Sequence, residues 1–122
     1  MFNQTTNNKF QKKFDLAERT SKFGMQVIAF SKEIPVSHIT KPIISQFVRS
    51  GTSVGANYYE AEEASSKKDF RNKISIAKKE AKETMYWLEM IIKAEPQLKD
   101  KARLIWKESH ELVLIFSSIM KK

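Results

Sequence analysis

Four successive blocks of the chain repeat apolar and small residues at alternating steps of three and four. The blocks fall within residues 16–34, 43–64, 70–91 and 102–119. Alternating steps of three and four keep one stripe of each helix facing a common axis. Four such helices joined by short connections predict an all-α chain that folds as an antiparallel, up-down four-helix bundle.

Helix-ending and helix-starting residues divide these blocks. Pro35 and Pro96 mark two connections, because the residue before a proline avoids the helical conformation. Thr40 is expected to cap the second helix, and Ser66 with Asp69 forms a capping box that opens the third helix. The sequence therefore predicts helices at about 13–33, 41–64 and 67–95, and a fourth from about 99 almost to the C-terminus.

Length and composition fit one domain. A chain of 122 residues can bury about two-thirds of the surface that its unfolded form exposes. Residues 1–12 lack apolar periodicity, so we expect a flexible N-terminal segment followed by a bundle domain at 13–122. No run of about 20 apolar residues and no secretory signal is visible, and cysteine is absent. We therefore expect a cytoplasmic protein without membrane contact.

The chain has a strong excess of positive charge. Its 22 Lys and Arg residues outnumber 14 Asp and Glu residues, giving a formal net charge of +8. The excess is spread over residues 1–34, 65–95 and 96–122, at +3 each, and is absent from residues 35–64, at −1. Such a balance favours polyanionic partners, above all DNA or RNA. A basic surface that is merely solvated is the alternative.

The third block carries the most regular basic spacing. Cationic residues at steps of four, seven and four lie on one side of a helix, and two more lysines flank that side. A ribbon of lysines can follow phosphates without reading base sequence. Glu80 and Glu83 interrupt the ribbon, and such pairs also stabilise an ordinary solvated helix. The candidate nucleic-acid-binding residues are Lys67, Lys68, Arg71, Lys78, Lys79 and Lys82.

Two segments are apolar on all sides rather than along one stripe. They are residues 85–92 and 112–116. One bundle core buries one stripe, so the surplus predicts self-association into a symmetric homo-oligomer. A broad core face with scattered exposed apolar side chains is the alternative. The candidate interface residues are Tyr86, Trp87, Met90, Val113 and Ile115.

The second block is rich in small and polar residues where leucine would be expected. Gly51 and Gly55 lie one turn apart on one helix face, and each glycine costs about 1 kcal/mol in a helix interior. We therefore expect a neighbouring helix to approach them closely, with close approach of a ligand backbone as the alternative. A polar ridge lies beside the apolar stripe, and its Asn57 is expected to be a buried polar group that fixes helix register. The candidate structural residues are Arg49, Gly51, Ser53, Gly55, Asn57 and Glu60.

The sequence contains no recognisable catalytic constellation. A di-iron bundle requires Glu-x-x-His motifs. The chain has Glu-x-x-Glu pairs at 60/63, 80/83 and 108/111 but no Glu-x-x-His, and its two histidines are His38 and His110. Neither a glycine-rich phosphate loop after a strand nor a nucleophile motif occurs. We therefore expect a non-enzymatic protein without a metal or another cofactor.

Residues 49–58, followed by Glu60 and Ala61, resemble the signature of the small bacterial four helix bundle proteins. That family includes proteins encoded in intervening sequences of large-subunit ribosomal RNA genes. The accessory variability proteins of diversity-generating retroelements are related to it. The resemblance extends over about residues 14–120, with further matches at 66–70, 78–84 and 86–88.

The resemblance implies an antiparallel four-helix protomer that assembles into a homopentameric barrel. The retroelement accessory proteins have a basic surface and associate with nucleic acid and with a reverse transcriptase. Together with the charge pattern, this favours a homo-oligomeric accessory protein that binds nucleic acid independently of sequence, with a nucleic-acid enzyme such as a reverse transcriptase as a candidate partner. The alternative function is an oligomeric adaptor that binds other proteins and has no nucleic-acid role.

Overall fold

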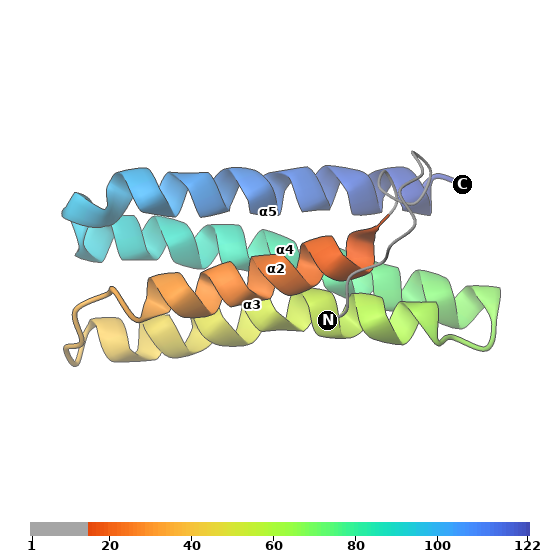
Figure 1. The fold of residues 1–122 in the computed structure, drawn as a ribbon, viewed down its shortest axis with the longest axis horizontal. Coiled ribbons are helices and arrows are strands. Elements are labelled where there is room, and N and C mark those ends of the chain that lie inside the picture. Colours follow the sequence, from red (N-terminus) through yellow and green to blue (C-terminus); the bar gives the residue numbers. More distant parts are fainter. Residues whose placement is uncertain (1–14) are drawn as a thin grey trace.

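The computed structural model describes residues 15–122, so the flexible segment expected at 1–12 lies outside the described residues. Four α-helices and a short 3-10 helix follow one another, and no strand occurs in this part of the chain. Consecutive helices run antiparallel and lie side by side (Figure 1), which confirms the predicted all-helical four-helix architecture. The elements are α2 (Leu16–Ser31), α3 (Thr40–Glu62), α4 (Lys67–Ala94), η1 (Pro96–Leu98) and α5 (Lys99–Met120).

The predicted N-cap of α4 at Ser66 is confirmed, although only one of the two hydrogen bonds of a capping box forms between Ser66 and Asp69. The Ser66 side chain accepts a hydrogen bond from the backbone N–H of Asp69 at 3.0 Å. The Asp15 side chain makes the equivalent bond to the Glu18 N–H at 3.1 Å and so caps α2. These bonds satisfy N–H groups that have no partner within the helix.

The role predicted for Thr40 is wrong. Thr40 is the first residue of α3, and its side chain bonds to the preceding connection instead of to the helix. The hydroxyl donates to the Pro35 carbonyl at 2.6 Å and accepts from the Ser37 N–H at 2.8 Å. Thr40 therefore holds the α2–α3 connection in its turn.

The core lies along the predicted stripes. Each helix contacts its neighbours in the chain extensively, whereas α2 and α5 meet only sparsely where they close the bundle. At this weaker α2–α5 seam, Arg19 of α2 forms an ion pair with Glu108 of α5 at 2.7 Å, and Lys101 of α5 forms one at 2.6 Å with Glu33, which follows α2 in the connection to α3. The largest fully buried apolar side chains come from all four helices and include Phe23, Val27, Phe47, Val54, Ile74, Leu88, Leu112 and Phe116.

Two glycines allow α2 and α3 to approach each other closely. A Cβ atom on Gly51 would lie 2.6 Å from Val27 Cγ2, and one on Gly55 would lie 3.2 Å from the Thr20 carbonyl oxygen. Real Cβ atoms do not tolerate the first distance, and the second is tight against backbone. Close packing by α2 therefore explains why α3 carries glycine at these positions.

The polar group expected to be buried in the bundle is not Asn57. Asn57 is half-buried, and its amide donates to the Ser53 carbonyl of its own helix at 2.9 Å. The hydroxyls of Ser50 on α3 and Thr84 on α4, both fully buried, lie 2.9 Å apart between the helices. The interior is crossed by this pair and by the Ser109 hydroxyl of α5, which donates to the Ala81 carbonyl of α4 at 2.7 Å, and not by Asn57.

Among residues 15–122, no helix combines the length and the apolar character needed to cross a membrane.

Candidate functional site

The six cationic residues predicted from sequence all lie on α4, and their spacing places them on one side of this helix, which we call the basic face. Four of the side chains are exposed, and Arg71 and Lys78 are half-buried. None of the six forms an ion pair within 4.0 Å with a carboxylate of residues 15–122. Lys73 on the same helix, in contrast, pairs with Glu60 at 2.7 Å. The basic face therefore presents cations that are not directly paired with a carboxylate of the described residues, although Lys79 is close enough to Glu83 to lower the pKa of that carboxyl.

The geometry of α4 strengthens this positive potential. Lys67 and Lys68 are in the first turn of the helix, where the backbone dipole places partial positive charge. From Lys67 to Lys82 the helix rises about 22 Å. The basic face is thus an elongated strip rather than a point charge.

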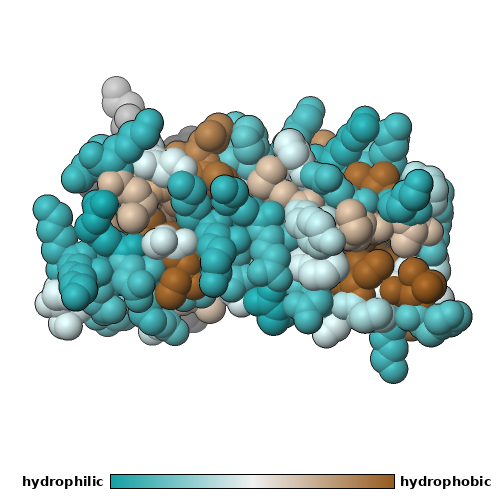
Figure 2. Space-filling model, turned by 180° about the vertical axis from the view of Figure 1, so that it is seen from behind, coloured by the Kyte–Doolittle hydropathy of each residue, from teal (hydrophilic) through white to brown (hydrophobic). Residues whose placement is uncertain are grey.

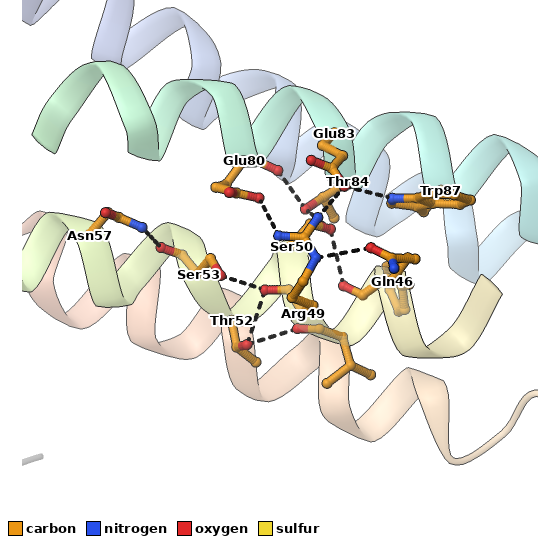
Figure 3. A network of polar contacts seen from close by, with 12 residues as sticks. Gln46, Arg49, Ser50, Thr52, Ser53, Asn57, Glu80, Glu83, Thr84 and Trp87 are labelled. Atoms are coloured by element: carbon orange, nitrogen blue, oxygen red, sulfur yellow. Dashed lines mark hydrogen bonds and ion pairs between the residues drawn. The ribbon is translucent and has the colours of Figure 1, made fainter. Parts of the chain in front are cut away.

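A polar network joins α3 to α4 (Figure 3). The Arg49 guanidinium of α3 donates to Glu80 at 3.1 Å and also pairs with Glu83, both on α4. Its Nε donates to the Gln46 side chain at 2.9 Å, and the Trp87 indole donates to Glu83 at 3.1 Å. The two glutamates that interrupt the lysine ribbon in sequence therefore turn toward α3 and bind Arg49.

These hydrogen bonds stabilise the charged forms of the side chains. The hydrogen bond from Trp87, followed by that from Arg49, lowers the pKa of Glu83 below its ordinary value even though burial opposes the shift. The hydrogen bond to Glu83 raises the pKa of Arg49. Both groups stay charged at neutral pH, so the network is an inter-helix clamp rather than an acid–base pair.

The predicted interface residues do not share one environment. Tyr86 is exposed and meets Trp87 edge to face, with ring centroids 4.9 Å apart. Trp87, Met90 and Ile115 are half-buried. Val113 is buried in the protomer core at 9% exposure, so the structure corrects its assignment to a surface between copies. On the rear face of the molecule apolar side chains are exposed in separate patches between hydrophilic ones (Figure 2).

Sequence reasoning missed a groove between α4 and α5. Glu89 and Ile92 of α4 line it together with Arg103, Trp106 and Lys107 of α5, and it encloses about 590 Å3. A signal was present in the sequence, because Arg103, Trp106 and His110 follow one another at steps of three and four. We call this feature the indole groove.

The chain is similar to known proteins over most of its length. The sequence model of the 23S rRNA-intervening sequence protein family matches residues 12–118. The chain belongs to this family. A crystal structure of a protein of unknown function from the S23 ribosomal protein family of Bacteroides thetaiotaomicron is similar, with a TM-score of 0.76 and 35% identity. The alignment covers 87% of this chain and 98% of that one.

No curated protein matches the chain. The family predicted from residues 49–61 is confirmed by the match of the intervening sequence family. Within residues 15–122 of this family member, no group of three or more histidine, aspartate or glutamate side chains is placed to hold a metal ion.

Proposed function

We propose that this intervening sequence family protein is a non-enzymatic, homo-oligomeric accessory protein that binds DNA or RNA through the basic face of α4. The observation that carries the proposal is the row of six cationic side chains without carboxylate partners in residues 15–122. Cations that neutralise phosphates release condensed counterions, which drives binding without base contacts. Contacts of this kind position the protein but carry no sequence information.

Self-association makes such weak contacts effective. We propose a closed homo-oligomer, with the number five coming from the family resemblance alone. Each copy carries +8, so several weak phosphate contacts on one particle act together through effective concentration. The exposed ring of Tyr86 supports an apolar contact between copies. Light scattering that gave the 14.2 kDa monomer throughout the micromolar range would contradict the assembly.

The test of nucleic-acid binding is a triple variant in which Arg71, Lys78 and Lys82 become Gln. Fluorescence anisotropy with generic duplex and single-stranded DNA and RNA at several salt concentrations measures affinity and salt slope. We expect weaker binding and a flatter slope, by up to about 0.9 for each duplex phosphate that the variant no longer neutralises. Affinity should vary little with duplex sequence.

A matched control removes the same charge elsewhere. Lys22, Lys32 and Lys41, all exposed on the α2–α3 half of the bundle, become Gln in this control. It should leave affinity and slope closer to those of the wild type than the α4 variant does. Equal effects of the two triple variants would show that the basic face is an ordinary solvated surface. If wild-type protein binds no nucleic acid at low salt, the proposal fails and the protein-binding adaptor remains.

A further inference from the structure

The indole groove is an open, largely apolar hollow at the end of the bundle where α4 leads into α5. Its walls are Ile92 and Trp106, with Glu89, Arg103 and Lys107 around them. Its volume of about 590 Å3 lies within the range of roughly 300–1,000 Å3 that is typical of small-molecule sites. An apolar hollow with a few polar groups at its edge is suited to a flat ring that carries polar substituents.

Trp106 is held in a fixed orientation beside this hollow. Its indole N–H donates to Glu89 Oε2 at 3.2 Å. Its ring lies on the imidazole of His110, with centroids 5.4 Å apart and planes 28° from parallel. Trp106 lines the groove, whereas His110 does not. The ring is thus anchored at its edge and supported on one side, as a stacking platform requires.

Two cations flank this platform. Arg103 and Lys107 are exposed and lie one helical turn apart on α5, on either side of Trp106 in sequence. Neither forms an ion pair within 4.0 Å with a carboxylate among residues 15–122. An aromatic surface between cations is the arrangement with which proteins hold the bases and backbone of single strands.

The groove continues the basic face. Lys78, Lys82 and Glu89 follow one another at steps of four and seven, so they lie on one side of α4. Lys82 and Glu89 are about 10 Å apart along the helix. Because α4 and α5 run side by side (Figure 1), a strand that follows the lysines arrives at Trp106.

We infer that the indole groove holds one unpaired nucleobase on Trp106, with a neighbouring phosphate on Arg103 and Lys107. The protein then binds single-stranded nucleic acid more tightly than duplex, in which the bases are already stacked and paired. This inference rests on the proposed nucleic-acid binding and adds the form of nucleic acid that is preferred. It adds a base contact to the phosphate contacts of the basic face.

Glu89 adds a preference among bases. Its carboxylate stands at the edge of the indole and carries only acceptors, so it accepts from an exocyclic amino group and repels a carbonyl oxygen. Cytosine offers such an amino group at N4. Uracil has a carbonyl oxygen at this position. Oligocytidine should therefore bind more tightly than oligouridine of the same length, and Glu89→Gln should reduce the difference.

The experiment compares Trp106→Leu with Trp106→Phe, using anisotropy with a short oligocytidine and with a duplex. We expect Trp106→Leu to weaken single-strand binding about five-fold or more, in line with the loss of one stacked base, and to leave duplex binding unchanged. Trp106→Phe keeps an aromatic ring and should lose less. In a Trp87→Phe background Trp106 is the sole tryptophan, so its fluorescence should be quenched by oligocytidine.

The possible outcomes distinguish failure of the indole-groove inference from failure of the proposed nucleic-acid binding by the basic face. Unchanged single-strand affinity in Trp106→Leu, with weaker binding by the Arg71, Lys78 and Lys82 variant, overturns the indole groove and leaves the basic face standing. Absence of binding by wild-type protein overturns both. A cytidine mononucleotide that binds as tightly as the oligomer would show that the groove is a nucleotide pocket and not part of a strand site. Circular dichroism confirms that each variant is folded.

Discussion

The two helical hairpins of the bundle differ in charge and in how their helices meet. The α2–α3 half, residues 15–64, has five basic and six acidic residues, whereas the α4–α5 half, residues 65–122, has fourteen basic and eight acidic ones. In the first hairpin the helices pack closely at Gly51 and Gly55, whereas in the second the indole groove lies between the helices. Close packing and uncompensated charge therefore lie on different hairpins, and substitutions should separate stability from binding.

The largest expected effect is on the α2–α3 hairpin, from Gly51→Leu. Even a Cβ atom at this position would lie 2.6 Å from Val27 Cγ2, so the whole side chain forces the two helices apart. Overpacking of this kind typically costs about 1–3 kcal/mol and occasionally more. Urea denaturation followed by circular dichroism should show the loss. Wild-type stability would refute close packing as the reason for this glycine.

The matched control is Gly24→Ala in the facing helix. A Cβ atom there would meet Thr52 Cα at 3.7 Å, an ordinary contact. Since alanine is favoured over glycine in a helix interior by about 1 kcal/mol, this variant should be neutral or stabilised. A loss as large as that of Gly51→Leu would mean that the hairpin tolerates no added volume anywhere.

The second effect is expected at alkaline pH, at Tyr58. The ring of Tyr58, in the first hairpin, packs against that of Phe116 in α5, with centroids 6.4 Å apart. Burial, with a smaller contribution from Glu62, raises the pKa of Tyr58 to about 12 from its ordinary 10.0. The contribution of the neutral Tyr58 side chain to the free energy of unfolding is fully present below pH 10. It is lost as the pH rises toward 12, because the phenol ionises at lower pH in the unfolded state than in the folded state. Between pH 9 and pH 11, Tyr58→Phe should lose up to about 1.4 kcal/mol less of its free energy of unfolding than wild type does. Urea titrations at pH 9 and pH 11 measure this, and equal losses in both proteins would contradict it.

A smaller effect is expected where the two hairpins meet, at the buried hydroxyl pair. Thr84→Val removes the partner of Ser50 but keeps the volume of the side chain. One intramolecular hydrogen bond contributes about 1 kcal/mol net, so the free energy of unfolding should fall by about that amount. Nucleic-acid affinity should not change, since Thr84 is fully buried. A change in affinity would mean that this contact is coupled to the basic face.

The smallest effect is expected in acid, at the Arg49 clamp. The pKa of Glu83 is lowered in the folded state, so its contribution is present above its ordinary value of 4.5 and is lost as the pH falls through the folded value. Glu83→Gln should be slightly less stable than wild type at pH 7, and the difference should be smaller at pH 3. A stability difference that is the same at both pH values would show that Glu83 acts through packing alone.

The periodicity of the sequence predicts those features that are formed within a single helix. The stripes, the Ser66 cap and the lysine ribbon can all be found because neighbours at steps of three and four are set by the sequence itself. The prediction for Thr40 is wrong because a hydroxyl at a helix start can bond backward, here to a carbonyl five residues earlier. Local sequence does not decide between the two directions.

Contacts between helices cannot be predicted from the periodicity of one helix. Val113 and Asn57 lie near the edges of their stripes, where a small rotation of the helix decides between core and surface. The bond between Glu89 and Trp106 depends on the register of α4 against α5, which neither helix encodes alone. The indole groove is therefore visible only in three dimensions, although its aromatic and basic residues are regularly spaced in the chain.

The weak α2–α5 seam has a consequence for motion. Both middle helices, α3 and α4, pack extensively on two partners, whereas α2 packs extensively on α3 alone and α5 on α4 alone. Opening the seam breaks the ion pairs of Arg19 and Lys101 and exposes part of the shared core, including Phe23 and Leu112, but leaves the α3–α4 contacts intact. A partial opening of the outer helices therefore costs less free energy than global unfolding. Native-state hydrogen exchange should therefore show α2 amides exchanging through this partial opening, with α3 and α4 protected until global unfolding.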